Sequence, residues 1–271
     1  MARVLLRVEF KAFSFLQENS VELKTTQKLV LALAALSGAA YAQTTPAPAP
    51  AAPEPDYTLS YNVGVVTDYR YRGISQTRLK PALQGGIDFA HKNGFYLGTW
   101  LSTIKWIKDA GGNSNVEWDI YGGYKGTAGP VAYDVGVLRY QYNSNDLNPS
   151  ANTTEVYAAG TMGVFTLKYS QAVTDLFGFA NSKGSYYLDG SAAFDLGDGW
   201  SVTPHIGYQH VAHNSPVSYT DYSLTGAKDF GNGFSASAAI VATDANKTLY
   251  VTPSGKFTGK TALVLGVKYS F

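Results

Sequence analysis

Ionisable side chains recur at every second position in several segments of the 271-residue chain. Because the side chains of a β-strand point alternately to its two faces, each such set shares one face. If the strands close into a barrel, these polar faces line a water-filled lumen. The candidate lumen residues are Asp68, Arg70, Arg72, Asp88, Glu117, Asp119, Tyr121, Asp134, Glu155, Tyr157, Lys168, Asp189, His205, Asp221 and Lys268, together with Asn62, Gln84, Lys125 and Gln209. Carboxylates outnumber Arg and Lys in this set, which favours a mild preference for cations.

The positions between these polar residues are mostly apolar or aromatic and are expected to face lipid. An Arg or Lys that faces lipid at the membrane midplane costs about 2–4 kcal/mol, so the charged face is assigned to the inside. Arg139 breaks this rule, because its parity conflicts with that of Asp134, and a β-bulge between them is expected. On the first strand the residues assigned to lipid are Tyr61, Val63, Val65, Tyr69 and Tyr71.

Two of the inward candidates, Arg70 and Arg72, could present a pair of guanidinium groups to an anionic solute. Asp68 and Asp88 could equally neutralise them, and we favour this pairing. Elsewhere on the inner face, Tyr121 and Tyr157 could offer a stacking surface to a sugar or an aromatic solute. The residue pattern does not decide between a charge-selective lumen and such a surface.

No catalytic or metal-binding residue is predicted. The chain has no Cys and four His, and it carries no nucleophile elbow, phosphate loop or HExxH motif. His210 and His213 alone make a weak metal site, and His205 is assigned to the lumen, which disfavours a lipase-like triad on the outer face. Lys and Arg nearly balance Asp and Glu (21 against 20), so no basic field indicates nucleic acid. No cofactor is expected.

The amino-terminal segment has the composition of a secretory signal peptide. Lys24 and Lys28 precede an apolar run at 29–36, and the small-residue sequence Ala40-Tyr41-Ala42 places the cleavage after Ala42. Residues 1–20 carry Glu9 and Glu18 and would make an unusually long charged lead for a signal peptide, so the true start of the chain is expected near Val21. Residues 43–56 are rich in Pro and Ala and predict an extended periplasmic linker.

From residue 57 onward, segments of about ten alternating residues are separated by turns. The predicted strands cover 57–72, 81–91, 94–106, 114–126, 130–143, 153–162, 164–172, 185–195, 200–210, 218–229, 234–243 and 260–271. Short and long connections strictly alternate, as in outer-membrane barrels with short periplasmic turns and longer outer loops. Asn-Gly or Asp-Gly lies between aromatic residues in three short turns, which suits tight hairpins. Pro204 removes one ladder hydrogen bond, so a bulge or a weak strand is expected there.

The last strand ends in an alternating apolar run. Val267, Tyr269 and the terminal Phe271 resemble the carboxyl-terminal signal by which bacterial outer-membrane proteins are handed to their assembly machinery. The expected partners of the protein are therefore this assembly machinery and the lipids of the outer membrane. The resemblance implies a cell outer-membrane location in a Gram-negative bacterium.

Three early segments carry a further resemblance: 68–77 (DYRYRGISQT), 81–89 (PALQGGIDF) and 94–100 (GFYLGTW). They are similar to the proteobacterial TorF-type porins, which implies a pore and brings no catalytic residue. We therefore expect an all-β fold, a single transmembrane antiparallel up-and-down barrel at 57–271 with about twelve strands and periplasmic termini. The expected function is diffusion of small solutes or ions. A non-conducting structural or adhesive barrel is the alternative, and a lipase-like enzyme is disfavoured.

Overall fold

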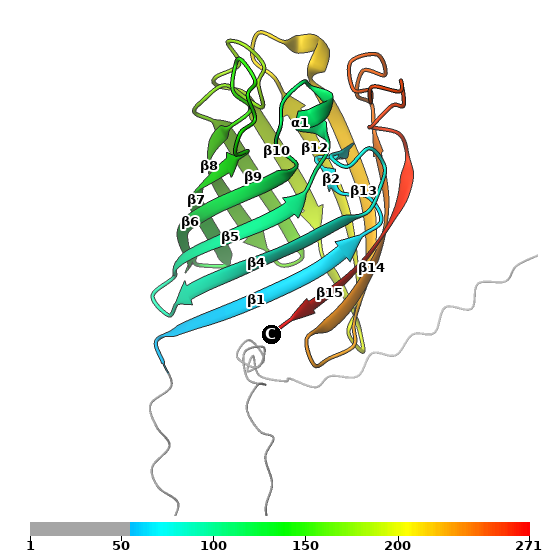
Figure 1. The fold of residues 1–271 in the computed structure, drawn as a ribbon. Coiled ribbons are helices and arrows are strands. Elements are labelled where there is room, and N and C mark those ends of the chain that lie inside the picture. The colour runs from blue at the N-terminus through cyan, green and yellow to red at the C-terminus, as the bar shows by residue number, and fades with distance from the viewer. Residues whose placement is uncertain (1–54) are drawn as a thin grey trace, which may run out of the picture. The chain divides into compact units, whose positions relative to one another are not determined.

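The computed structural model describes residues 55–271, and the predicted signal peptide and most of the linker lie outside this part. The wall strands form one antiparallel sheet that closes on itself (Figure 1), as predicted. Closure joins the first strand to the last, with Val65 opposite Val267. β10 and β11 occupy one position beside β12, so the wall has twelve strand positions. The wall strands are β1 (Tyr57–Val66), β4 (Ala82–His91), β5 (Phe95–Thr103), β6 (Val116–Ala128), β7 (Val131–Gln141), β8 (Thr153–Met162), β9 (Phe165–Ala172), β10 (Tyr186–Ala192), β11 (Phe194–Gly197), β12 (Trp200–His210), β13 (Tyr219–Asp229), β14 (Phe234–Thr243) and β15 (Ala262–Ser270).

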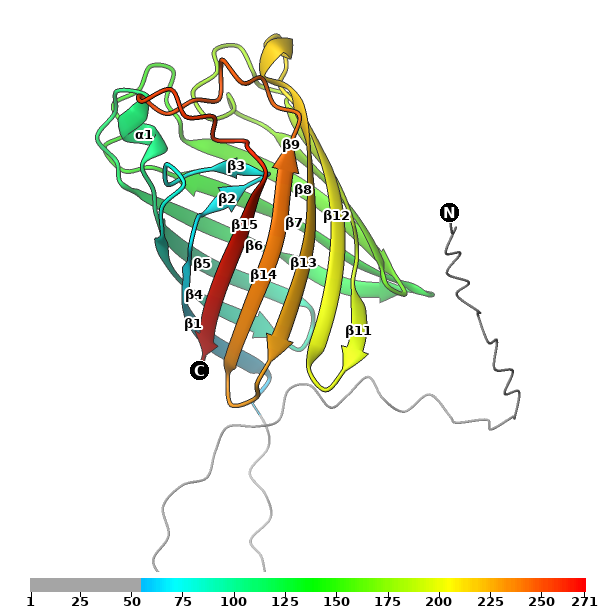
Figure 2. The same ribbon diagram turned by 90° about the vertical axis from the view of Figure 1, so that its right-hand side faces the viewer.

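Short turns gather at one end of the barrel and long loops at the other (Figures 1 and 2). Two of the short turns use the expected chemistry, because Asp198-Gly199 and Asn232-Gly233 all have positive φ angles, between 50° and 80°. The long loops carry a short helix, α1 (Trp106–Asp109), and a 3-10 turn, η1 (Ser215–Val217). Among residues 55–271, no helix is long and apolar enough to cross a membrane.

The outer wall exposes apolar side chains along every strand, as a lipid-facing surface requires. Leu83, Leu167, Ile206 and Leu263 each keep more than half of their surface exposed. At the turn end, Phe271 stacks on Tyr61 with ring centroids 5.6 Å apart, and the backbones of these two residues exchange hydrogen bonds of 2.9 Å. The carboxyl terminus therefore completes the closing edge of the barrel.

The prediction for residues beyond Val66 was wrong. The first strand ends there instead of at residue 72, and the chain turns into the barrel to form a small hairpin of β2 (Arg70–Tyr71) and β3 (Ile74–Ser75) (Figure 2). Tyr69 is buried instead of lipid-facing, and Tyr71 is partly buried on the inside. The inward path is favoured because both hydroxyl groups find polar partners on the inner wall, Glu117 and Tyr140 respectively.

Two local predictions about strand irregularity also need correction. β7 pairs with both neighbours without any register shift, so the bulge expected near Arg139 is absent; Arg139 faces outward and donates to Thr154 at 3.0 Å. β12 runs straight through Pro204 against β13, so Pro204 causes no bulge. The neighbouring strand breaks there instead, between β10 and β11, because Pro204 offers no donor to the ladder. The register shift in this region lies at Asp195/Gly197.

Candidate functional site: the lumen and its inward hairpin

The hairpin of β2 and β3 turns on only two residues, Arg72 and Gly73. Their φ angles are 45° and 78°, the left-handed pair that a tight hairpin turn requires. A Cβ on Gly73 would lie 2.4 Å from Cγ2 of Thr243 and 2.8 Å from Cβ of Asp221. The tip of the hairpin therefore touches β13 and β14, on the wall across the lumen from β6 and β7, which Tyr69 and Tyr71 contact.

The root of the hairpin is fixed by Asp68 and Arg70. Asp68 accepts hydrogen bonds from Arg70 Nε at 2.6 Å, Ser75 Oγ at 2.5 Å and Thr77 Oγ1 at 3.2 Å. Arg70 Nη1 donates to the carbonyl oxygens of Gly73, Thr258 and Lys260 at 2.9–3.1 Å. The Arg70 guanidinium therefore holds the loop through Nε and Nη1, whereas its Nη2 has no hydrogen-bond partner and Arg70 borders a cavity beside the hairpin.

The tip is held by the side chain of Arg72. Its guanidinium donates to Glu155 Oε2 on β8 at 2.7 Å and to Gln209 Oε1 on β12 at 2.5 Å. It also lies over the rings of Tyr187 and Tyr71, 4.2 and 4.8 Å from their centroids. Burial is the largest single influence on the pKa of Arg72 and lowers it, but the neighbouring Glu155, Tyr71 and Tyr140 together outweigh burial and raise that pKa well above its ordinary value. Arg72 therefore stays charged at any physiological pH.

Tyrosine hydroxyl groups organise most of the inward carboxylates. Each donor comes from another strand, from the hairpin segment or, for Tyr142, from the loop after β7: Tyr69 and Tyr142 donate to Glu117, Tyr121 to Asp88, Tyr96 to Asp134, Tyr140 to Glu155 and Tyr187 to Asp221. Tyr157 shares a hydrogen bond with Tyr96. Of these tyrosines the sequence reasoning named only Tyr121 and Tyr157 as inward. Parity could have found Tyr140 and Tyr187, which share a face with Asp134 and Asp189.

The remaining candidates lie between the hairpin and the turn end. Lys168 lies 4.0 Å over the Tyr157 ring, and His205 lies 3.5 and 3.6 Å from Asp189 and Asp221. Asp134 and Asp189 keep about 30% of their side-chain surface exposed, at 29% and 30%. A cavity of about 360 Å³ beside the hairpin is bordered by Arg72, Tyr71, Tyr140, Lys168, Tyr187, Asp189, His205 and Asp221. Lys268 is inward by parity and exposed at the turn end, whereas Asp119 is buried and its Oδ1 has no hydrogen-bond partner.

The loop end of the lumen is filled by apolar side chains, which we call the apolar cap. It consists of three clusters that share members, because Phe177 joins the first to the second and Tyr250 joins the second to the third. Its buried members are Tyr69, Ala82, Ile104, Ile107, Tyr140, Tyr142, Ala151, Ala172, Leu176, Val211, Val217, Ile74, Tyr219 and Ala245. The hairpin contributes to two of the clusters, so it joins the polar lumen to the cap.

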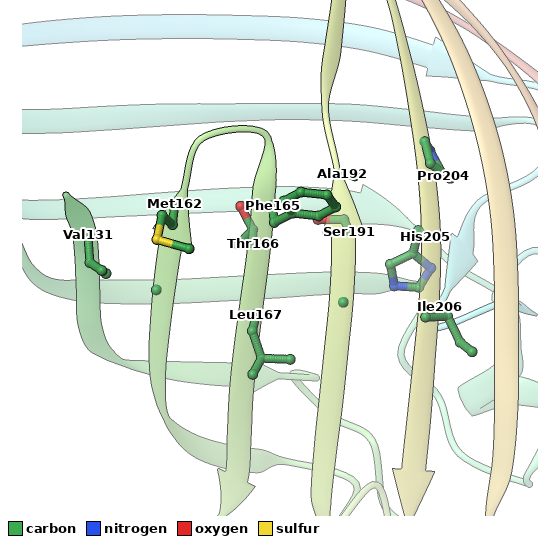
Figure 3. Close-up of a pocket in the computed structure, with 12 residues that line it drawn as sticks. Val131, Met162, Phe165, Thr166, Leu167, Ser191, Ala192, Pro204, His205 and Ile206 are labelled. Carbon is green, nitrogen blue, oxygen red and sulfur yellow. The ribbon is translucent and has the colours of Figure 1, made fainter.

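Two other features do not form a site. In the described part of the chain, no three His, Cys, Asp or Glu residues are placed to hold a metal ion. His210 stacks on Tyr186, while His213 contacts the Asn181 carbonyl oxygen. A larger hollow of about 750 Å³ lies over β7–β10 and β12 (Figure 3), but its lining is mainly apolar wall residues such as Met162 and Leu167 near the β10/β11 break.

Comparison with known proteins agrees with this architecture. Residues 50–271 match a family described as bacterial protein of unknown function (Gcw_chp). The KdgM porin, solved alone and in complex with disordered oligogalacturonate, has a TM-score of 0.52 at 12% identity over 79% of this chain and 98% of its own. The NanC porin has a TM-score of 0.52 at 10% identity over 79% of this chain and 99% of its own. These identities establish the shared fold alone. No curated protein matches the sequence.

Proposed function

This chain belongs to the Gcw_chp family of bacterial proteins of unknown function, and we propose that it is an outer-membrane pore for small solutes or ions. The closed barrel, its apolar outer wall and its likeness to two porin folds support this proposal. The same proposal includes the TorF-type porin identity, export by a signal peptide cleaved near Ala42, and assembly through Val267, Tyr269 and Phe271.

The observation that carries the proposal is the charged contact at the tip of the hairpin. Arg72 and Glu155 are both almost fully buried, with 7% and 2% of their side chains exposed. A buried ion pair seldom stabilises a protein more than apolar residues of similar size do, so stability alone gives no reason for one here. A hairpin that narrows a lumen and is held by side-chain contacts can instead set the size and charge of what passes.

The proposed selectivity is for cations. Below the hairpin, Asp88, Asp134 and Asp189 face the lumen together with Lys125, Lys168 and Lys268. Over the whole inner face, however, the carboxylates of Asp68, Asp88, Glu117, Asp119, Asp134, Glu155, Asp189 and Asp221 outnumber the basic side chains of Arg70, Arg72, Lys125, Lys168 and Lys268. Rings of carboxylates favour cations. The KdgM porin has been solved with an acidic sugar, but the acidic inner face of this chain is unfavourable for such a solute. Of the two candidates for stacking a sugar or an aromatic solute, Tyr157 already has Lys168 over its ring at 4.0 Å, whereas the Tyr121 hydroxyl donates to Asp88.

A non-conducting structural or adhesive barrel is the second candidate, and the apolar cap favours it. Planar-bilayer recordings on the purified protein separate the two. We expect discrete conductance steps, and larger steps after residues 69–76 are replaced by a short Gly-Ser linker. If neither protein conducts while both are folded, as judged by heat-modifiable gel migration, the barrel is structural and the pore proposal fails.

A further inference from the structure

A second cavity, of about 420 Å³, lies at the loop end and is separate from the lumen site. It is bordered by three connections: Thr77, Arg78, Lys80 and Pro81 after the hairpin, Thr103, Ile104 and Lys105 before α1, and Thr252, Pro253, Ser254 and Lys256 before β15. These connections follow β1, β5 and β14, which are close neighbours in the wall order β14-β15-β1-β4-β5. We call this cavity the rim pocket.

The rim pocket is strongly basic. Four of its side chains are Arg78, Lys80, Lys105 and Lys256, and no Asp or Glu borders it. Arg78 is held by an ion pair with Asp109 of α1. Lys80, Lys105 and Lys256 are exposed, and within residues 55–271 none of the three forms an ion pair. Their charges are therefore available to an anion.

Hydrogen bonds fix the segments that border the rim pocket. Lys105 N donates to the Gln76 carbonyl oxygen at 2.8 Å, which joins the second connection to the first. In the third connection, Thr252 N donates to the Lys256 carbonyl oxygen at 2.9 Å, and Thr252 Oγ1 lies 3.0 Å from Ser254 Oγ. Arg78 and the following Leu79 both have left-handed φ angles, 59° and 62°, an arrangement that the fold maintains at this position.

The position of the rim pocket indicates where its ligand would come from. Thr103, which borders it, lies on the outward face of β5 and accepts a hydrogen bond from Leu83 N at 3.1 Å. Directly below, Leu83 and Leu101 expose 56% and 45% of their surface on the lipid-facing wall. An anionic group that enters here can therefore carry acyl chains that continue along the wall.

We propose that the rim pocket binds a phosphate group of a glycolipid in the outer leaflet, an inference that rests on the outer-membrane location proposed above. The lysine ammonium groups supply charge to the phosphate oxygens, and the exposed hydroxyl group of Ser254, which contacts the buried Thr252 hydroxyl, supplies a hydrogen-bond donor. The acyl chains lie against Leu83 and Leu101. Pore activity is not needed for this binding.

The test is a titration of the folded protein in neutral detergent with lipid A, a bis-phosphorylated glucosamine lipid. The variant is Lys80→Gln/Lys256→Gln, and the matched control is Lys183→Gln/Lys247→Gln, which removes two exposed loop charges outside the pocket. Each lysine beside an anionic lipid contributes a factor of about five, so we expect affinity to fall about 25-fold in the variant. The control and a charge-preserving Lys80→Arg/Lys256→Arg variant should stay within about twofold of the parent protein.

Three results would overturn the proposal. One is equal loss of affinity in the variant and the matched control. Another is equal affinity for lipid A from which both phosphates have been removed. The third is that inorganic phosphate binds as tightly as lipid A, which would remove the lipid from the assignment. Conductance is recorded separately on the same samples, so failure of the pore proposal is seen independently of lipid binding.

Discussion

Replacing Arg72 by Met is the sharpest test of the role given to the hairpin. The change keeps much of the side-chain volume but removes the guanidinium that contacts Glu155 and Gln209. Glu155 is 1% exposed, and its Oε2 would keep only the hydroxyl of Tyr140 at 3.3 Å. Its other oxygen, Oε1, already has no hydrogen-bond partner. Removing one member of a buried ion pair costs about 3–5 kcal/mol, so we expect a loss of that size in the free energy of unfolding.

A double variant, Arg72→Met/Glu155→Leu, separates stability from gating. It removes both charges, and apolar replacement of a buried pair is often neutral or stabilising, so its unfolding free energy should lie within about 1–2 kcal/mol of the parent protein. Both variants, however, release the tip of the hairpin from β8 and β12. We therefore expect conductance to rise in both and stability to fall only in the single variant.

Two measurements check this reasoning. Unfolding in urea is followed by tryptophan fluorescence in detergent micelles, and single-channel conductance is recorded in planar bilayers. If Arg72→Met changes the unfolding free energy by less than about 1 kcal/mol, the buried pair is not formed as described. If conductance rises only in the destabilised single variant, loss of stability and not release of the tip explains the current.

Three further predictions concern other parts of the barrel. Gly73→Ala should lower the free energy of unfolding by about 1–3 kcal/mol more than the matched Gly255→Ala does. The two φ angles are similar, 78° and 75°, but only a Cβ at position 73 would meet neighbouring atoms. Equal losses in chemical unfolding would mean that the tip does not touch the wall. Asp88→Asn/Asp134→Asn should move the reversal potential in a salt gradient toward zero. The difference in reversal potential between variant and parent protein should shrink at 1 M salt, where the Debye length is about 3 Å. Clear anion selectivity in the parent protein would contradict the assigned lumen charge. Deleting Phe271 should reduce the amount of folded protein in the outer membrane more than Phe230→Ser does, because Phe271 closes the barrel edge against Tyr61. The two residues are similarly exposed (54% and 57%), so Phe230→Ser is a matched control. Equal amounts of folded protein, measured by heat-modifiable gel migration, would count against the terminal signal.

The barrel could be predicted because lipid and water impose alternation on every wall strand. The inward path of residues 67–81 could not, since Asp68, Arg70 and Arg72 continue the same alternation after the strand has ended. Contacts distant in the sequence redirect the chain here. Arg72 adopts a φ angle of 45° in a turn where Asn or Gly is usual. Contacts with Glu155 and Gln209, 83 and 137 residues away, hold it there. Parity identifies the face of a side chain but not its partner across the lumen, so the tyrosine–carboxylate pairs were also beyond the sequence.

The two ends of the hairpin are held in different ways, and this difference bears on how a solute could pass. At the root, Asp68 and Arg70 form hydrogen bonds within the hairpin and to the carbonyl oxygens of Thr258 and Lys260. At the tip, the polar contacts with the wall are fewer: those of the Arg72 guanidinium and one hydrogen bond from the neighbouring Tyr71 to Tyr140 on β7. Opening the lumen at the tip therefore requires the exchange of one guanidinium and one hydroxyl between partners, while opening at the root requires disruption of a whole network. A pore built on this barrel is expected to widen at the β8–β12 side, where Glu155, Gln209 and the cavity beside Lys168 and Asp189 lie together.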